Sequence, residues 1–387
     1  MARSTKPRPK AATKRTDAAQ SAKFTKSAAA PLAAVRGQID AIDAQLQELI
    51  SVRARIAQTV GVTKRAAGTA DFYRPEREAE VLRSVMARNH GPLSNEEMVR
   101  LFREIMSACL AQQEPLKIAF LGPEGTFTQQ AVLKHFGHSV RALPLPAIDE
   151  VFREVESGVA DFGVVPIENS TEGTVSHTAD MFLISPLKIC GEVELRVHQH
   201  LMGRVESLER IERICSHQQS LAQCRGWLAE NLPAVERIAV SSNAEAARRA
   251  RDEAGTAAIA GDAAAEVYGL RVLVPQIEDR PDNTTRFLVV GRKLLEPSGR
   301  DRTTLLLSAP DTADSGSLLK LLEPFARHGI TLSRLESRPS RRKAWDYVFF
   351  VDAEGHVDDP AVALALAEVR KVASLVKVLG SYPRAVL

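Results

Sequence analysis

The sequence has few aromatic residues, few cysteines and no long apolar run. Aromatic side chains make up only 5% of its 387 residues. No stretch approaches the roughly 18 uninterrupted apolar residues of a transmembrane helix, which excludes a protein anchored in that way. The four cysteines form no CxxC pair and are too few for a disulfide scaffold; they are Cys109, Cys190, Cys215 and Cys224. We therefore expect a reducing, cytoplasmic location.

Acidic residues are almost missing from residues 1–30, which carry eight Lys or Arg against the single Asp17. The rest of the chain has 43 basic and 47 acidic residues, so its body is not a nucleic-acid binder by charge. Residues 1–30 also lack an apolar segment, which excludes a secretory signal. Pro7 and Pro9 disfavour the amphipathic helix of a transit peptide, so we expect a disordered basic tail.

Residues 31–114 have the pattern of an all-helical domain. Apolar residues recur three and four positions apart from Leu32 to Val60, which predicts a long helix with a coiled-coil-like seam. Two further helices are predicted, Arg74–Arg88 with Pro75 in its first turn and Ser94–Gln113 with a capping box at Ser94. One seam position is occupied by Arg53, which should meet an anion because an unpaired charge is costly in an apolar surface. The alternatives are a structural arginine with a partner in the chain and a side chain that extends to water.

Residues 115–296 alternate between strand-like and helical segments, which indicates an α/β domain with parallel sheets. The domain has room for one large sheet or two lobes, and we expect two lobes around a cleft. The predicted strands are Lys117–Leu121, Val140–Leu143, Asp161–Ile167, Ile189–Leu195, Arg213–Cys215, Ile238–Val240, Ala257–Ile259 and Phe287–Val290.

Pro297-Ser-Gly299 follows with the composition of a linker. Residues 302–387 then predict a βαββαβ unit of the ferredoxin-like type. The chain is therefore expected to be a multi-domain protein: a tail, a helical domain, a two-lobed α/β domain and a βαββαβ domain.

The helical domain resembles the all-helical chorismate mutases in the frame Arg36, Arg53, Lys64, Arg77-Glu78 and Gln113. The resemblance implies that the three arginines clamp the carboxylates of chorismate, that Lys64 and Gln113 stabilise the ether oxygen, and that Glu78 holds the substrate hydroxyl. Arginine forks match carboxylates, and a [3,3] rearrangement needs only a compact conformer and complementary charge. Two positions depart from the family pattern: Cys109, which the resemblance implies contacts the substrate, replaces Ser, and Arg74 replaces Asp.

The α/β domain resembles prephenate dehydratase. The resemblance rests on a glycine turn ending in Thr126, on Ile167-Glu-Asn169-Ser170, on Ser216-His217 with Gln223, and on Asn283-Thr-Thr285-Arg286-Phe287. It implies two lobes like those of a periplasmic binding protein, with Thr285 as the residue most closely tied to catalysis. The other implied cleft residues are Thr126, Asn169, Ser170, Ser216, Gln223 and Arg286, the last either supporting the site or binding a carboxylate.

The proton donor in this cleft stays open. A hydroxyl such as Thr285 is able to hydrogen-bond or protonate the leaving oxygen. His217 is the alternative acid at neutral pH, although a histidine directly after a strand is as often a capping residue. The pairs His198/His200 and His135/His138 have no third ligand nearby, so neither a metal nor a cofactor is expected.

The C-terminal unit resembles the ACT domain of phenylalanine-sensitive dehydratases through Gly316-Ser317-Leu318-Leu319 and Glu336-Ser337-Arg338-Pro339. Both motifs are implied to contribute to an amino-acid site between paired domains; the structural alternative is a turn plus an Arg–Glu pair. Together the three domains resemble a bifunctional chorismate mutase–prephenate dehydratase that phenylalanine inhibits. The competing interpretation is a catalytically degenerate sensor of aromatic metabolites.

The cations of the helical domain also predict a homodimer. Arg36 and Arg53 lie 17 residues apart on one expected helix, about 25 Å, whereas chorismate is only about 10 Å across. Lys64 lies further still along the same helix. One helix therefore cannot bring Arg36, Arg53 and Lys64 to one ligand, and an antiparallel second copy would supply Arg36 in trans.

Overall fold

The computed structural model describes residues 32–66, 73–310, 315–340 and 347–386. The prediction of a disordered tail falls on residues 1–30, outside the described part. The chain divides into two compact units, residues 1–55 and 56–387, and each is described by itself. No helix in the described residues combines the length and the apolar character needed to cross a bilayer.

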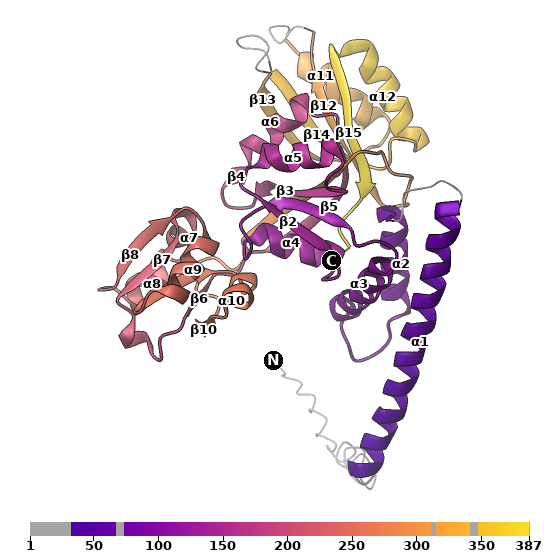
Figure 1. Ribbon diagram of the computed structural model, residues 1–387. Coiled ribbons are helices and arrows are strands. Elements are labelled where there is room, and N and C mark those ends of the chain that lie inside the picture. The colour runs from indigo at the N-terminus through magenta and orange to yellow at the C-terminus, as the bar shows by residue number, and fades with distance from the viewer. Residues whose placement is uncertain (1–31, 67–72, 311–314, 341–346, 387) are drawn as a thin grey trace, which may run out of the picture. The chain divides into compact units, whose positions relative to one another are not determined.

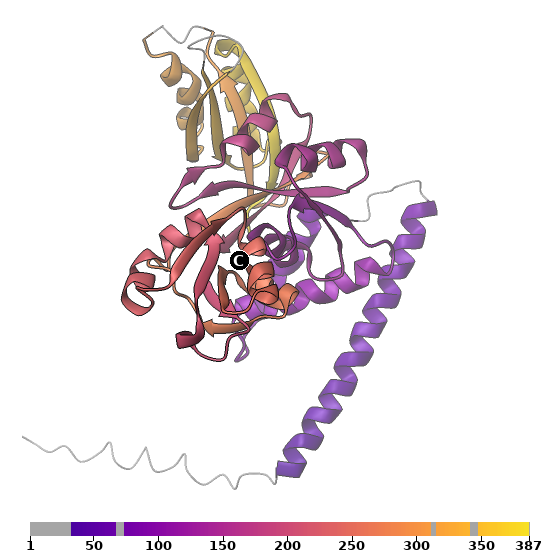
Figure 2. The same cartoon turned by 60° about the vertical axis from the view of Figure 1, so that its left-hand side comes forward.

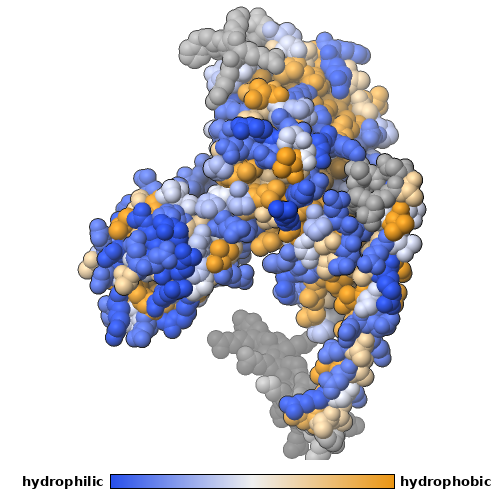
Figure 3. All heavy atoms as spheres, viewed as in Figure 1, coloured by the Kyte–Doolittle hydropathy of each residue, from blue (hydrophilic) through white to orange (hydrophobic). Residues whose placement is uncertain are grey.

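Helix α1 (Leu32–Ala66) contains the predicted seam and continues six residues beyond Val60. All described residues of the first unit belong to this helix. Its seam is therefore exposed, with Leu32 at 65%, Ile39 at 52% and Leu46 at 50% of full accessibility. Figure 3 shows apolar side chains among charged ones along α1. An apolar stripe of this kind requires a partner surface.

Helices α2 (Pro75–Arg88) and α3 (Asn95–Ala111) agree with the prediction to within two residues. The Ser94 hydroxyl accepts a hydrogen bond from the Glu97 amide at 3.2 Å, which satisfies one of the free N–H groups at the helix start. The Glu97 carboxylate pairs with Arg100 instead of closing the capping box.

The α/β domain consists of two sheets, which confirms the two lobes (Figures 1 and 2). The first lobe has the strand order β2-β1-β3-β11-β5, with the short β4 paired to β3. Its elements are β1 (Lys117–Leu121), α4 (Phe127–Phe136), β2 (Arg141–Leu145), α5 (Ile148–Ser157), β3 (Phe162–Asn169), β4 (Gly173–Thr174), α6 (Ser176–Ile184), β5 (Lys188–Arg196) and β11 (Thr284–Gly291).

The second lobe is a five-stranded sheet with the order β10-β6-β9-β7-β8. Small alanines pack between this sheet and α9, which allows the helix to lie close to the strands. Its elements are β6 (His200–Gly203), η2 (Leu208–Arg210), β7 (Arg213–His217), α7 (Gln218–Gln223), α8 (Arg225–Asn231), β8 (Glu236–Val240), α9 (Asn243–Asp252), β9 (Thr256–Ala260), α10 (Asp262–Tyr268) and β10 (Arg271–Val274).

Both sheets are mixed, so the expectation of parallel sheets was wrong. Strand β11 runs antiparallel to both neighbours, β3 and β5, and β6 runs antiparallel to β9 and β10. The physical reason is that the chain leaves the first lobe after β5, builds the second lobe and returns in β11. Because the end of β5 at Arg196 and the start of β11 at Thr284 lie side by side, the chain leaves and returns at the same edge of the sheet, and β11 therefore runs opposite to β5.

The C-terminal domain forms the predicted βαββαβ unit, with the antiparallel strand order β13-β14-β12-β15. Its elements are β12 (Asp301–Ser308), α11 (Ser317–Arg327), β13 (Leu332–Pro339), β14 (Tyr347–Glu354), α12 (Pro360–Val372) and β15 (Leu375–Pro383).

The C-terminal domain is packed firmly against the first lobe. Leu306, Phe350 and Leu379 belong to the same buried cluster as Phe182 and Ile189 of the first lobe. A Cβ on Gly380 would overlap the backbone of Ile189, so the close approach of β15 to β5 requires glycine there. Residues 297–299 therefore do not act as a loose linker. The amides of Ser298 and Gly299 donate to the Asp301 carboxylate, at 2.8 and 3.0 Å.

Candidate functional site

A cavity of about 770 Å³ lies between the two lobes of the α/β domain. The first lobe contributes the glycine turn and α4 start around Thr126, the end of β3 at Asn169 and the start of β11 at Thr285. The second lobe contributes the start of α7 at His217 and the start of α9 at Asn243. Most of these residues come from the ends of elements, the usual location of a ligand site between two α/β lobes.

Thr285 and Asn169 form a hydrogen-bonded pair on neighbouring strands, β11 and β3. The Asn169 side-chain oxygen accepts from the backbone amides of Thr171 and Glu172, at 2.9 and 3.1 Å. This fixes the orientation of the amide, so its NH₂ group donates to the Thr285 Oγ1 at 2.8 Å and to the Asn283 side-chain oxygen at 2.9 Å. The Thr285 oxygen is then an acceptor towards Asn169, and its own proton is available to a molecule in the cavity.

The second-lobe wall is a buried polar network in which Ser216 plays a supporting part. Ser216 is fully buried and donates to the Ile259 carbonyl at 2.7 Å, and it does not line the cavity. Its neighbour Asn243 lines the cavity and donates to Ser220 at 2.9 Å. Gln223 lines the cavity as expected, and Gln199 donates to its side-chain oxygen at 3.2 Å.

The sequence analysis predicted no role for Gln199, Ser220 or Asn243. Asn283 was named there only as part of a motif. Each is a common polar residue without a local pattern. The one available signal was that Ser242-Asn243 begins a helix directly after the strand-like Ile238–Val240.

Three further predicted cleft residues occupy different positions. Thr126 lines the cavity and caps α4, where its Oγ1 accepts from the Gln129 amide at 3.4 Å. Ser170 lies outside the lining, and its hydroxyl accepts from the Thr284 amide at 3.0 Å. His217 lines the cavity and also caps α7 through its ring nitrogen, so it is a capping residue that faces the cleft.

Arg286 lies outside the cleft lining. Its guanidinium contacts Glu192 at 2.9 Å and Asp352 of the C-terminal domain at 2.7 Å. Side chains alternate between the two faces of a strand, so Arg286 points away from the side on which Thr285 meets the cavity. Of its two expected roles, this position favours the supporting one over binding of a substrate carboxylate.

Sequence comparison matches the three parts of the chain to three known families. Residues 35–114 match chorismate mutase type II, residues 118–294 match prephenate dehydratase, and residues 303–371 match the ACT domain. A bifunctional chorismate mutase/prephenate dehydratase of Stutzerimonas stutzeri is 56% identical over 93% of this chain and 100% of its own length. The protein of the same description from Pseudomonas aeruginosa is 55% identical over 92% of this chain and 98% of its own.

The chain belongs to the bifunctional chorismate mutase/prephenate dehydratase family.

Solved structures with the same fold cover the dehydratase and ACT parts. A prephenate dehydratase from Arthrobacter aurescens in complex with L-Phe is 38% identical, with a TM-score of 0.65 over 70% of this chain and 90% of its own. GqqA, described as a quorum-quenching acylase, has the same TM-score at 30% identity, over 70% of this chain and 98% of its own. Because two described activities share this fold, function has to be argued from the site.

The mutase domain does not assemble its predicted site within unit 56–387. Arg77 is exposed and pairs with Glu80 on its own helix at 2.8 Å. Glu78, the next residue, turns inward and lies 3.6 Å from Arg103, and burial raises the pKa of its carboxyl. The Gln113 amide donates to the Ala57 carbonyl of α1 at 2.8 Å, and Lys64 lines a separate pocket.

The remaining predicted mutase residues are distributed over both units. Cys109 is buried, with 3% of its surface exposed. Arg36 is exposed and Arg53 half-buried, both on α1 in the unit of residues 1–55. Arg74, the second position that departs from the family pattern, pairs with Glu76 and Glu296, each at 2.5 Å.

The ACT domain places its predicted effector residues on two faces of one sheet. Glu336 and Arg338 face the dehydratase part, where Glu336 accepts from Thr174 at 2.8 Å and Arg338 pairs with Asp180 at 3.1 Å. Ser337, between them, points to the opposite face and is exposed. Gly316 begins α11 with φ +87°, a conformation that favours glycine, and Ser317 and Leu318 form the first turn.

The histidine pairs noted in the sequence have carboxylate or aromatic neighbours. His198 lies 2.7 Å from Glu278, His200 3.1 Å from Asp262 and His138 2.7 Å from Glu104. His135 lies beside Tyr73, and burial lowers the pKa of its imidazole to about 3. Among the described residues, no group of three or more metal-ligating side chains occurs.

Proposed function

We propose that this chain rearranges chorismate to prephenate and then dehydrates and decarboxylates prephenate to phenylpyruvate, under inhibition by phenylalanine. The observation that supports this most directly is the Thr285–Asn169 pair in the cleft of a chain that is similar over 93% of its length to a bifunctional enzyme. These reactions place the protein in phenylalanine biosynthesis, as an isomerase and a carbon–oxygen lyase.

The dehydration is explained by a donor held at a fixed position. Loss of CO₂ and of the ring hydroxyl makes prephenate aromatic, so the enzyme mainly has to help hydroxide leave and hold the carboxylates. The Asn169 NH₂ group donates a hydrogen bond to the Thr285 oxygen. The hydroxyl proton of Thr285 is therefore available for a hydrogen bond to the departing oxygen. His217 on the opposite wall is the alternative donor. Thr126 and the start of α4 supply backbone N–H groups towards an anionic substrate.

The first reaction needs no acid, base or nucleophile. Chorismate has to be held as a compact conformer, with cations on its carboxylates and at the ether oxygen. Arg36, Arg53 and Arg77 are the proposed carboxylate clamps, Lys64 and Gln113 the groups at the ether oxygen, and Glu78 the partner of the hydroxyl. In this chain Arg77 and Glu78 point in different directions from α2, so the site requires a rearrangement or a second chain.

A homodimer paired along α1 supplies that second chain. Arg36 and Arg53 are 17 residues apart on one straight helix, about 25 Å, so they cannot both bind one chorismate. An antiparallel copy would place its Arg36 beside Arg53 of the first chain. The exposed seam of Leu32, Ile39 and Leu46 provides the apolar surface for this pairing.

Regulation is proposed to act through the contact between the ACT domain and the β3–β4 hairpin. Glu336 accepts from Thr174 on β4, and Thr174 is paired across the hairpin with Glu168, the residue before Asn169. An effector that engages Glu336 would therefore act on the hairpin next to Asn169, whose side chain holds Thr285. The four cysteines are buried free thiols, which fits a cytoplasmic enzyme.

The proposal is tested by supplying chorismate to the purified full chain. We expect prephenate and then phenylpyruvate to accumulate, each identified by mass spectrometry against a no-enzyme control. Binding of prephenate or phenylalanine without either product would support the degenerate sensor instead.

Replacing Thr285 by alanine should reduce the kcat of prephenate dehydration about 100-fold or more, because general-acid assistance is worth that factor. Thr285→Ser keeps the hydroxyl and is the matched control, expected to retain much of the activity. Mutase activity should be almost unchanged in both. Dehydratase turnover that survives in Thr285→Ala would remove this hydroxyl from the mechanism.

Mixing two inactive variants tests the two-chain mutase site. Arg36→Ala and Arg53→Ala should each abolish the mutase reaction, since each removes a carboxylate clamp. In a mixed dimer one site carries both defects and the other neither, so mutase activity should partly return after chain exchange. Confirmed exchange without recovered activity, or an active enzyme that sediments as a monomer, would exclude Arg36 acting in trans.

Glu336→Ala and Gly316→Leu should weaken inhibition by phenylalanine, measured as a rise in the concentration that halves dehydratase activity. The reason is that both changes alter ends of elements assigned to the effector site. Thr174→Val, compared with Thr174→Ser, tests whether the Glu336 contact transmits the effect. Inhibition curves that match the wild type in both ACT variants would move the effector site elsewhere.

A further inference from the structure

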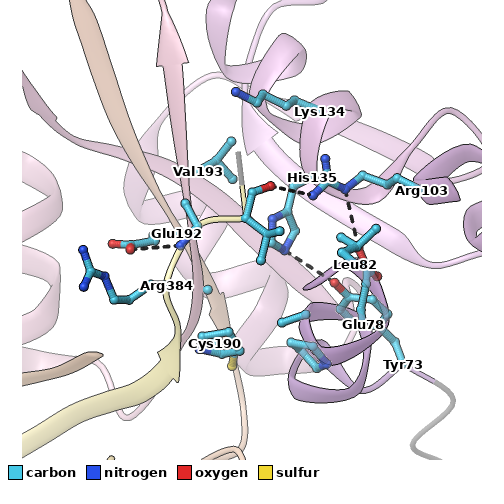
Figure 4. A pocket seen from close by; sticks show the side chains of 16 residues that line it. Tyr73, Glu78, Leu82, Arg103, Lys134, His135, Cys190, Glu192, Val193 and Arg384 are labelled. Atoms are coloured by element: carbon cyan, nitrogen blue, oxygen red, sulfur yellow. Dashed lines mark hydrogen bonds and ion pairs between the residues drawn. The ribbon is translucent and has the colours of Figure 1, made fainter. Parts of the chain in front are cut away.

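Gln199 is a buried polar side chain in the wall of the cleft, and its oxygen is left without a hydrogen bond. It lines the cavity, is 1% exposed, and its side-chain oxygen has no partner among the described residues. In the pocket of Figure 4, Arg103 also has a buried nitrogen without a hydrogen bond, but that nitrogen lies 3.6 Å from the Glu78 carboxylate. A buried acceptor without a partner is uncommon, so its presence in the cleft calls for an explanation.

Gln199 lies where the chain crosses from the first lobe to the second, since β5 ends at Arg196 and β6 begins at His200. The Gln199 backbone amide donates to the Glu278 carboxylate at 2.9 Å, and its backbone carbonyl accepts from the Ile277 amide at 2.8 Å. Both partners belong to the segment by which the chain returns to β11. The main chain of Gln199 is therefore held against the second crossing, and its side chain starts from a fixed point.

The direction of the Gln199 amide is set by the main chain through Asn243 and Ser220. The Asn243 oxygen accepts from the His217 backbone amide at 3.2 Å, and a backbone amide can only donate. Ser220 donates its proton to the same oxygen at 3.1 Å, so towards Gln199 its hydroxyl is an acceptor. The Gln199 NH₂ group donates to this acceptor at 3.1 Å. Gln199 therefore turns its NH₂ group, and not its oxygen, towards α7.

Gln223, three residues further along α7, is the second acceptor of this NH₂ group. Its side-chain oxygen accepts from Gln199 at 3.2 Å, so its own NH₂ group is the part of the amide left for a molecule in the cavity that it lines. Thr285 of the first lobe is set in a similar way, because Asn169 donates to its oxygen and leaves its proton. Each lobe thus contributes a donor that a neighbouring amide directs.

The composition of the cavity wall indicates what the Gln223 donor binds. Prephenate carries two carboxylates, which at neutral pH only accept hydrogen bonds. The residues that line the cavity, all of them described, include no lysine or arginine. Its acidic residue Glu245 is already paired with Arg248 at 2.8 Å and Arg249 at 3.1 Å. The carboxylates therefore have to be bound by neutral donors, and a hydrogen bond from such a donor to a carboxylate is stronger than one between neutral groups.

We propose that Gln199 is a positioning residue for the dehydration. It holds the Gln223 amide with its NH₂ group available to the cleft, where that group binds a carboxylate of prephenate. The unpartnered oxygen of Gln199 is a consequence of this role, because the amide gives both of its N–H groups to α7. The inference rests on the proposed dehydration of prephenate in this cleft.

The test is a double-mutant cycle in the full chain, made from Gln199→Met, Gln223→Met and the variant with both changes. Methionine has nearly the length of glutamine and carries no N–H donor. If Gln199 acts through Gln223, replacing it matters only while the Gln223 amide is present. The KM and kcat of prephenate dehydration, the mutase rate and the unfolding temperature are measured for each.

We expect Gln223→Met to raise the KM for prephenate about tenfold, because a hydrogen bond to a charged group is lost. Gln199→Met should raise it about threefold to fivefold, since the Gln223 amide is then free to turn. The doubly substituted chain should stay within about twofold of Gln223→Met. In all three the kcat should change less than about twofold, because an interaction made equally with substrate and transition state affects KM alone.

Thr256→Val is the matched control. Thr256 is a second-lobe residue that is also 1% exposed, its hydroxyl has no partner among the described residues, and it lies outside the cleft lining. Its replacement removes a buried polar atom without touching Gln223, so the KM should stay within about twofold of wild type. The mutase rate should match the wild type in every variant of the cycle.

Effects of Gln199→Met and Gln223→Met that multiply in the doubly substituted chain would overturn the inference, because the two residues would then act independently. A wild-type KM in Gln199→Met would overturn it as well. If Gln199→Met does not fold, Gln199→Glu takes its place: it cannot donate to Gln223, and an unchanged KM would refute the positioning role. A wild-type chain that does not dehydrate prephenate would instead refute the proposed function.

Discussion

Strand β11 is the element on which the arrangement of the larger unit depends. It returns from the second lobe, fills the slot between β3 and β5, and by running antiparallel to both completes the sheet of the first lobe. Thr285, at its start, meets Asn169 across the ladder at the cleft, while Arg286 meets the ACT sheet. Because alternate residues of a strand face opposite sides, one element connects the proposed chemistry to the proposed regulatory domain.

The two proposed active sites are held by different kinds of interaction. The dehydratase cleft is preorganised within one chain, since Asn169 is fixed by backbone amides before any substrate is present. By our proposal the mutase site takes Arg36 from a second chain, and the long helix α1 leaves an apolar seam exposed for that pairing. Burying a Leu or Ile side chain stabilises by about 1.5–3 kcal/mol, so pairing along several such residues would provide enough free energy to hold two chains together.

The buried charges between the dehydratase and ACT parts carry an energetic risk. Removing one partner from such a cluster typically costs about 3–5 kcal/mol, because the remaining charge is left without compensation. Burial alone would lower the pKa of Arg286. Tyr382, Asp352 and Glu192 together raise this pKa, so the guanidinium stays charged. The first lobe and the ACT sheet are therefore coupled by a contact that tolerates little change in geometry.

Local periodicity in the sequence was sufficient to predict the helices, most strands and the βαββαβ unit, because these depend on neighbours along the chain. It left one large sheet and two lobes both open, and the resemblance to prephenate dehydratase implied the two lobes. The family resemblance, which rests on short motifs, pointed to the Thr285 region. Only the tertiary structure decided the antiparallel return of β11, the supporting position of Ser216 and the pairing of Arg286 with Asp352. Strand direction and side-chain partners depend on residues far apart in the sequence, and for Arg286 and Asp352 the separation is 66 residues.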